Sequence, residues 1–269
     1  MEDIKNNAGL TEEEFLKQYK PSDYERPSVT VDMLILCMNK CLENLKVLLI
    51  QRKDHPYINQ WALAGGFVGI KESTYEAAVR ELKEETGLEN IYLEQLYTMS
   101  QPDRDPRMRV IDVAYIALIQ EQGVKAGDDA KDALWFDITT FNNEKLILQN
   151  KEKNITIEYN LTKKTFKNGV INIEGFVPVH CNGEKLAFDH AEIILEGLLR
   201  LRNKVLYSDI AFNLLPEVKQ VYEVILGKQL YKANFKAHIE EKLNALDYKI
   251  SSSTKNGKFS QAYSYKGEK

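Results

Sequence analysis

The residues best suited to chemistry lie in one charged segment of the chain, residues 66–88. On an α-helix, which rotates by about 100° per residue, Glu81, Glu84 and Glu85 fall within an arc of about 100°. Three carboxylates on one helix face repel one another, and a hard divalent cation such as Mg²⁺ or Mn²⁺ offsets that repulsion. The arc by itself fits a solvated acidic helix face as well as an all-oxygen metal site, and the complete spacing of the segment decides for the metal site.

The helix that would carry these carboxylates has a start and a stop in the sequence. Ser73 and Glu76 form a capping box, and Gly87 supplies the left-handed residue that ends many helices. Arg80 is placed to pair with Glu72 across the preceding loop, or with a member of the carboxylate cluster. Either pairing would hold the carboxylates in place.

The complete spacing resembles the Nudix box. Its positions are Gly66, Glu72, Arg80, Glu81, Leu82, Glu84, Glu85, Gly87 and Leu88. The resemblance implies a mixed sheet sandwiched by helices, and hydrolysis of a nucleoside diphosphate linked to another moiety. It implies metal binding by Glu81, Glu84, Glu85 and the carbonyl of Gly66, with Arg80 and Glu72 as the orienting pair. The base that takes the proton from water would be Glu81 or a carboxylate outside the box.

The elements around this segment indicate an α+β protein. Thr11 and Glu14 form another capping box, and its helix would end at Pro21. The expected strands are 28–37, 45–51, 91–99, 109–120 and a short one at 132–136. Residues 142–180 predict an inserted, polar-edged hairpin with strands at 154–159 and 170–176 and turn residues at 165–169. Asp189 is expected to cap a helix over 190–202, whose apolar residues recur at helical spacing.

The charge distribution suggests two functions in one chain. Residues 201–269 hold 12 Lys and Arg against 7 Asp and Glu, whereas residues 1–200 hold 24 against 33. Helical patterns at 208–215, 217–226 and 231–246 precede an Asn256-Gly257 hairpin signal between 248–251 and 259–265. Three helices and a hairpin describe a winged helix-turn-helix. We therefore expect a Nudix domain over 1–203 and a winged-helix domain over 204–269.

A closer resemblance covers nearly the whole chain. Segments 24–32, 61–68, 102–107, 186–190 and 211–216 resemble the Nudix-related transcriptional regulators and the ADP-ribose pyrophosphatases of the same build. This subgroup is usually dimeric, and its regulators respond to ADP-ribose, sugars or sugar phosphates. Three features depart from its pattern: Ala64 in place of Pro, a short segment between Pro216 and Val221, and the length of 142–180.

The resemblance and the basic tail together predict contacts with double-stranded DNA. The candidate residues on the recognition helix and the wing are Lys232, Asn234, Lys236, Lys242, Lys255 and Lys258. A dimerisation or packing appendage is the alternative for this tail. Net charge of this size is modest for a DNA-binding unit.

Four arginines are the anion-facing candidates for the substrate: Arg52, Arg104, Arg107 and Arg109. Each has a surface salt bridge as its alternative, because Asp103 and Asp105 are close in sequence. His180-Cys181 lacks spaced partners for zinc and predicts strand-end residues. His190 is expected to be structural.

Two functions follow as expectations. The first is a Mg²⁺- or Mn²⁺-dependent hydrolase of ADP-ribose or a related nucleoside diphosphate sugar. The second is a repressor whose Nudix domain only senses such a ligand, and the two can coexist. A housecleaning pyrophosphatase for nucleoside triphosphates is disfavoured because those enzymes are usually shorter. We expect a cytoplasmic protein, since the chain shows no export signal, no membrane span and only three Cys. The resemblance to a usually dimeric subgroup implies a homodimer.

Overall fold

The computed structural model describes most of the chain. The described residues are 4–20, 25–38, 43–124, 126–127, 130–168, 170–204, 218–227, 229–231, 243–251 and 259–265. The predicted helix at 208–215 and all six candidate DNA-contacting residues lie outside these ranges: Lys232, Asn234, Lys236, Lys242, Lys255 and Lys258.

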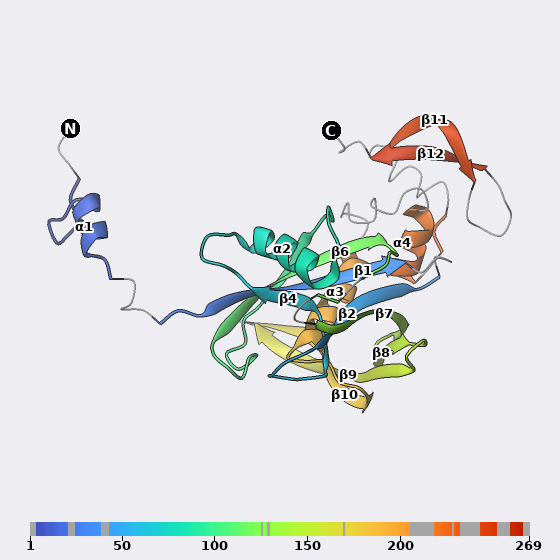
Figure 1. The fold of residues 1–269 in the computed structure, drawn as a ribbon, viewed down its shortest axis with the longest axis horizontal. Coiled ribbons are helices and arrows are strands. Elements are labelled where there is room, and N and C mark those ends of the chain that lie inside the picture. Colours follow the sequence, from blue (N-terminus) through green and yellow to red (C-terminus); the bar gives the residue numbers. More distant parts are fainter. Residues whose placement is uncertain are drawn as a thin grey trace.

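A ten-stranded mixed sheet forms the centre of the molecule (Figure 1). Its strands are β1 (Ser28–Met38), β2 (Leu45–Arg52), β3 (Trp61–Ala62), β4 (Ala64–Phe67), β5 (Glu94–Met99), β6 (Val110–Gln120), β7 (Ala130–Phe141), β8 (Lys145–Asn150), β9 (Ile155–Asn168) and β10 (Ile171–Gly183). The order is β10-β9-β8-β7-β2-β1-β6-β5, with β3 beside β2 and β4 beside β1. The β1–β6 pair is parallel and the other pairs are antiparallel, which makes the sheet mixed.

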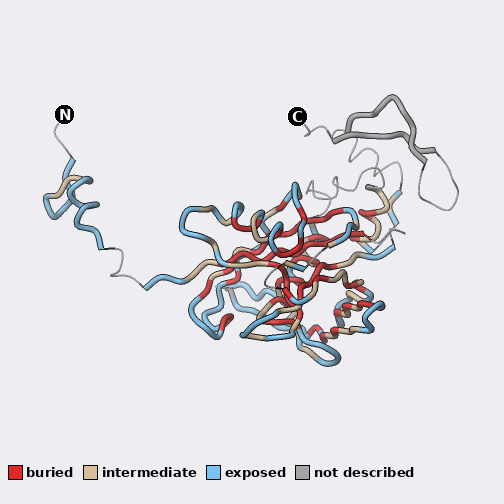
Figure 2. Tube along the Cα trace, in the orientation of Figure 1, coloured by how far each residue is buried: buried red, intermediate tan, exposed pale blue. Residues whose placement is uncertain are grey.

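Helices cover both faces of the sheet and give an α/β/α sandwich. Helix α2 (Thr74–Thr86) packs on β1 and β4, whereas α3 (His190–Lys204) packs on β1, β5 and β10. Helix α4 (Val218–Leu226) lies against α3. Helix α1 (Glu12–Gln18) begins at the predicted capping box and buries none of its side chains (Figure 2).

The central strand β1 shows why both faces are covered. Leu34 and Leu36 belong to the core on the α3 side, and Met33 and Ile35 belong to the core on the α2 side. Successive side chains of a strand point to opposite faces, so a continuous apolar run needs a cover on each side. Burial follows this rule, because the buried residues concentrate in the sheet and along α2 and α3 (Figure 2).

Helix α2 begins and ends where the sequence predicts. The Ser73 side chain accepts from the Glu76 backbone N–H, and the Glu76 carboxylate accepts from the Ser73 N–H. Gly87 ends the helix with φ of 73°, a conformation that glycine adopts without steric cost. Ala77 and Ala78 face the sheet and are fully buried, so the helix backbone lies close to β1 and β4.

The region after β6 differs from the prediction in extent. β7 runs through Phe141 because it pairs with β2 on one side and β8 on the other. The expected hairpin exists, but β9 continues through residues 165–168, which were expected to form a turn. Unbroken pairing with β10 overrides the local turn preference there. The segment 142–180 therefore extends the central sheet.

The carboxy-terminal part is described only in pieces. Besides α4, it contains an antiparallel pair of strands, β11 (Leu243–Ser251) and β12 (Phe259–Tyr265). This pair agrees with the predicted hairpin, but the helix expected to reach Leu246 is wrong over its last four residues. Leu243 pairs with Tyr265 and Ala245 with Tyr263, and this pairing with β12 selects the strand. Within the described ranges, no helix is both long and apolar enough to cross a bilayer.

Candidate functional site

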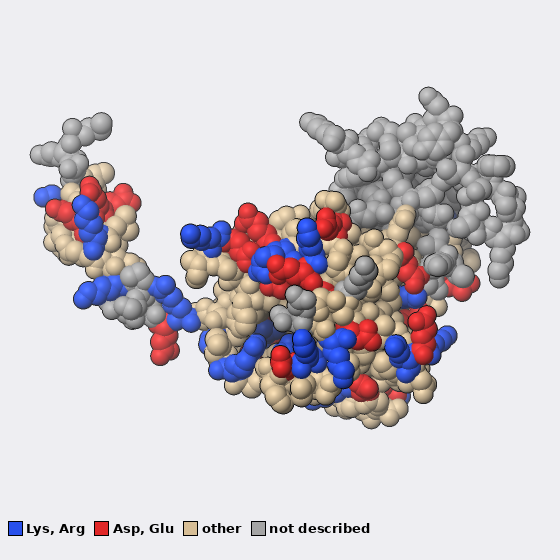
Figure 3. All heavy atoms as spheres, in the orientation of Figure 1, with Lys and Arg blue, Asp and Glu red and all other residues tan. Residues whose placement is uncertain are grey.

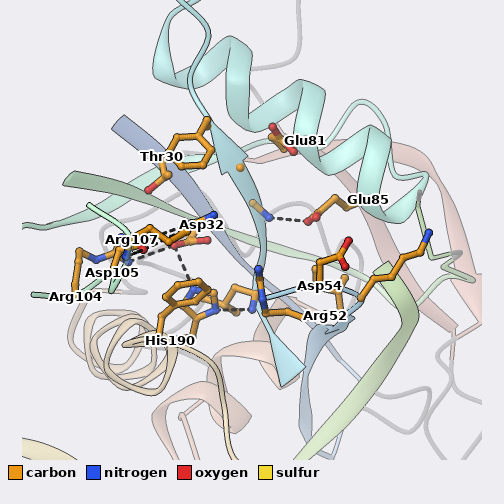
Figure 4. A pocket seen from close by; sticks show the side chains of 17 residues that line it. Thr30, Asp32, Arg52, Asp54, Glu81, Glu85, Arg104, Asp105, Arg107 and His190 are labelled. Carbon is orange, nitrogen blue, oxygen red and sulfur yellow. Dashed lines mark hydrogen bonds and ion pairs between the residues drawn. The ribbon is translucent and has the colours of Figure 1, made fainter. Parts of the chain in front are cut away.

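A cleft of about 480 Å³ opens on the α2 side of the sheet. Its walls come from β1, β2, β4, α2, the loop at 104–107 and the residues just before and at the start of α3 (Figure 4). This volume lies in the range of small-molecule sites. Segments that are far apart in sequence therefore meet around one opening.

The predicted carboxylates of α2 occupy two different settings. Glu81 and Glu85 line the cleft, and the Glu85 carboxylate accepts from the Gly65 N–H at 2.7 Å. Glu84 does not line it, and its side chain is 58% exposed. Two members of the predicted cluster therefore face the cleft, and the third lies toward solvent.

Arg80 binds both the loop and the cluster, so both pairings considered for it occur together. Its guanidinium donates to Glu72 at 2.7 Å, to Glu81 at 2.7 Å and to Glu84 at 3.0 Å. It also donates to the Phe67 carbonyl at 3.1 Å. Acidic side chains gather over α2 with basic side chains among them (Figure 3). Arg80 therefore reduces the mutual repulsion of these carboxylates.

The pKa values of the two carboxylates that Arg80 binds most closely move in opposite directions. Hydrogen bonds from Arg80 and from the Gly69 N–H lower the pKa of half-buried Glu72 to about 2. Burial raises the pKa of Glu81, and Arg80 offsets this only in part. Of the two, Glu81 therefore has the more basic carboxylate, and it is the one that lines the cleft.

The carboxylate and carbonyl oxygens at the cleft are the type of ligand that a hard divalent cation prefers, but their present spacing does not form a complete metal site. A Cβ at Gly66 would lie 2.2 Å from the Glu81 carboxylate, so only glycine lets the backbone approach that group so closely. Across the described ranges, no three acidic, His or Cys side chains are close enough together to hold a metal. The residues that would hold one at the cleft are Glu81, Glu85 and the Gly66 backbone, whereas Glu84 pairs with Arg80 outside the cleft lining.

Of the four predicted arginines, Arg52, Arg104 and Arg107 line the cleft. Arg109 does not, and its prediction as an anion-facing residue is corrected. Its guanidinium donates to the backbone carbonyls of Ser100, Gln101 and Val110. Its role is to satisfy the backbone of the loop before β6.

Arg52 and Arg107 flank the Phe188 ring, with guanidinium carbons 5.0 and 5.9 Å from its centroid. Arg107 pairs with Asp105, but Arg52 makes no ion pair with any described residue and donates to the Pro56 carbonyl. Burial lowers the pKa of Arg52, and the nearby charge of Arg107 lowers it further. An anion between the two guanidiniums would relieve this repulsion.

Arg104 lies at the floor of the cleft in a network that the sequence did not predict. Its guanidinium binds both oxygens of Asp189, at 2.7 and 2.8 Å, and Asp32 at 3.5 Å. His190 lies 3.4 Å from the same Asp32 oxygen. The Asp189 carboxylate therefore binds Arg104, while its backbone carbonyl accepts from the first turn of α3.

Asp32 is the site residue that sequence reasoning missed. Burial would raise the pKa of Asp32, but His190 and Arg104 lower it below its usual range. Beneath it, burial raises the pKa of Asp112 well above its usual range, and the charge of Asp32 raises it further. The available signal was an aspartate inside each of two apolar strands, because buried carboxylates need a partner.

One minor prediction, for His180, agrees with the geometry. The His180 ring lies near the carbonyls of Gly183 and Glu184, at the end of β10, as expected for a strand-end residue. Cys37 is buried in the core, where burial raises its pKa. Neither residue contributes to the cleft.

Known proteins that contain a Nudix domain are similar to this chain over part or most of its length. A sequence profile described as NUDIX domain matches residues 28–156. The "ADPR responsive transcriptional repressor NtrR" of Acinetobacter baylyi is 31% identical over 241 residues, covering 86% of this chain and 79% of the repressor. An ADP-ribose pyrophosphatase of Methanocaldococcus jannaschii is 44% identical over 137 residues, which cover 49% of this chain and 76% of the pyrophosphatase.

Solved structures extend the similarity. A MutT/nudix family protein from Enterococcus faecalis has a TM-score of 0.74 and 34% identity, over 96% of this chain and 94% of its own. Shewanella oneidensis NrtR, crystallised with a 27mer DNA, has a TM-score of 0.62 and 27% identity, over 88% and 93%. A short motif can arise on an unrelated scaffold, but sequence and fold shared over nearly the whole length cannot, and this chain belongs to the Nudix family.

Proposed function

We propose that the chain is a Mg²⁺- or Mn²⁺-dependent hydrolase of the diphosphate in ADP-ribose or a related nucleoside diphosphate sugar. One observation carries the proposal: carboxylates of the Nudix box line one wall of the cleft, and Arg52 and Arg107, both near the Phe188 ring, line another. Carboxylates suit a cation, and guanidiniums suit phosphate oxygens. A metal-bound diphosphate satisfies both walls together.

In the proposed reaction, water attacks one phosphorus, and the bond from that phosphorus to the bridging oxygen breaks. The products from ADP-ribose are AMP and ribose 5-phosphate. When bound, a divalent metal would lower the pKa of the attacking water and neutralise charge on the diphosphate. Glu81, Glu84, Glu85 and the Gly66 carbonyl would hold the metal, and Arg80 with Glu72 would position them. Arg52 and Arg107 bind the phosphate oxygens and fix the substrate for attack.

A ligand-responsive regulator is the second proposed function, alone or together with turnover. The supporting observation is that the similarity to the repressor and to the DNA-bound protein extends past the Nudix domain. We propose that residues 204–269 form a winged helix, that the chain is a cytoplasmic homodimer, and that ADP-ribose alters its affinity for an operator. The proposed phosphate contacts are Lys232, Lys236, Lys242, Lys255 and Lys258, and Asn234 reads a base.

The test of hydrolysis is Mg²⁺-dependent release of AMP from ADP-ribose and from a panel of nucleoside diphosphate sugars. A double substitution, Glu84→Gln with Glu85→Gln, is expected to abolish turnover while the melting temperature stays nearly unchanged. Metal-dependent turnover that persists in this variant would mean that other carboxylates hold the metal. If the wild type does not turn over but ADP-ribose raises its melting temperature, the non-catalytic sensor is favoured.

The test of DNA binding is selection from a random duplex library, followed by affinity measurements at several salt concentrations. Exchange of Lys232 and Lys236 for Gln should weaken binding to every duplex and reduce the slope of affinity against salt. Unchanged affinity in this variant would favour the packing-appendage alternative for the tail.

A further inference from the structure

The floor of the cleft is polar to an unusual degree for its burial. Thr30, Asp32, Arg104 and His190 all line the cleft, yet each is between 3% and 9% exposed. They come from β1, from the loop before β6 and from the start of α3. Buried polar groups are costly unless they have partners, so a polar floor calls for polar partners in the ligand.

Asp32 is held in a fixed orientation on this floor (Figure 4). The Leu63 N–H donates to His190 Nδ1 at 2.8 Å, which leaves the proton of a neutral ring on Nε2. Nε2 then donates toward Asp32 Oδ2, which Arg104 also approaches. The two donors to Asp32 are therefore fixed by other groups: the Leu63 N–H holds the His190 ring, and Asp189 holds the Arg104 guanidinium with both oxygens.

The charge of the floor excludes a phosphate as its partner. Asp32 and Asp189 carry two negative charges against the one positive charge of Arg104, and Asp112, whose pKa burial raises well above its usual range, adds no positive charge. A net negative floor repels phosphate oxygens, whereas Arg52 and Arg107, which lie around the Phe188 ring beside His190, attract them. Neutral hydrogen-bond donors, above all the hydroxyls of a sugar, are suited to a buried carboxylate.

The close approach of β4 keeps this carboxylate at the cleft surface. A Cβ at Gly65 would lie 2.5 Å from Asp32 Oδ1 and 2.2 Å from the Val31 carbonyl. Because residue 65 is glycine, β4 can pair with β1 at this point without covering Oδ1 with a side chain.

We propose that Asp32 is a specificity-determining residue that accepts hydrogen bonds from the hydroxyl pair of a ribose in the ligand, with Arg104 and His190 as its positioning residues. This inference rests on the proposed function, because it names a subsite of the same cleft. ADP-ribose carries two riboses, one on the adenosine and one at the far end of the diphosphate. The chemistry at Asp32 is the same for either.

The test is calorimetric binding in EDTA, where no turnover occurs, of wild type and Asp32→Asn. The ligands are ADP-ribose, ADP, which lacks the far ribose, and 2′-deoxyadenosine diphosphate ribose, which lacks one adenosine hydroxyl. Asparagine keeps the shape of the side chain but removes the charge. We expect it to weaken ADP-ribose binding on the order of tenfold to a hundredfold.

The other ligands identify which ribose is bound. An unchanged affinity for ADP would assign Asp32 to the far ribose. A loss for ADP and ADP-ribose, but not for the deoxy ligand, would assign it to the adenosine ribose. An equal loss for all three ligands, or no loss, would overturn the proposal.

The matched control is Asp103→Asn, at an exposed aspartate of the same loop as Arg104 that does not line the cleft. It should leave the affinities for the three ligands as in the wild type. A loss of affinity equal to that of Asp32→Asn would mean that the effect does not come from the cleft floor and would overturn the proposal. Failure of the wild type to bind any of the three ligands would overturn both this inference and the proposed substrate class, whereas binding without turnover would overturn only the hydrolase.

Discussion

Arg80 and Arg104 each hold carboxylates at the same cleft, but in opposite surroundings. Arg80 is 36% exposed, and its three acidic partners lie within eight residues of it in sequence. Arg104 is 4% exposed, and its partners Asp32 and Asp189 are 72 and 85 residues away. One cluster is local and solvated, and the other is assembled by the fold and buried.

This difference predicts different energetic roles. Water screens the Arg80 pairs, so they order the carboxylates without adding much to the stability of the fold. Around Arg104 there is little water to replace a lost partner, so each charge depends on the others. The exposed cluster can therefore rearrange when a metal binds, whereas the buried one fixes the shape of the cleft floor.

Arg104→Met is expected to have the largest effect. It leaves two carboxylates buried without their cation, which should lower the free energy of unfolding by about 3–5 kcal/mol. Arg80→Met should lower it by about 1 kcal/mol or less. Urea denaturation of the two variants measures this directly, and similar losses would remove the distinction between the clusters.

Gly66→Ala tests the close contact between the Gly66 backbone and the Glu81 carboxylate, in the cluster around Arg80. Its Cβ would meet the Glu81 carboxylate at 2.2 Å and must displace it. Metal-dependent turnover should fall about a hundredfold, equivalent to roughly 2.7 kcal/mol of transition-state stabilisation. Gly123→Ala is the control, because a Cβ there has no atom within 4 Å. Full activity in Gly66→Ala would show that Glu81 does not need its observed position.

The smallest effect is a pH dependence at Glu72. Its pKa is about 2 in the folded protein, below the ordinary value of 4.5, so the ionised form favours folding. The advantage of the wild type over Glu72→Gln in melting temperature should be complete above pH 4.5 and should fall away as the pH drops through 2. Melting curves of both proteins between pH 6 and pH 2 provide the measurement. A difference that stays constant over this range would contradict the ion pair.

Much of the fold could be predicted because its signals are local. The capping box at Ser73 and the stop at Gly87 define α2, and the apolar runs of β1 and β6 define buried strands. The predicted strand ends were wrong where pairing with a neighbour extends the strand beyond its own sequence pattern. β7 is longer than predicted because it pairs with β2 and with β8, and β9 continues through a segment of turn-forming residues because it pairs with β10.

The same division applies to the site. A helix repeats about every 3.6 residues, so the sequence by itself determined that Glu81 and Glu85 share a face. The complete spacing of the box carried the resemblance to the Nudix family, and Arg80 was left to pair with Glu72 or with the carboxylate cluster. Only the tertiary structure decided that Asp32, Arg104 and His190 meet beneath that face and that Arg109 turns away. Contacts across more than 70 residues depend on the order of strands in the sheet, and no local spacing records that order.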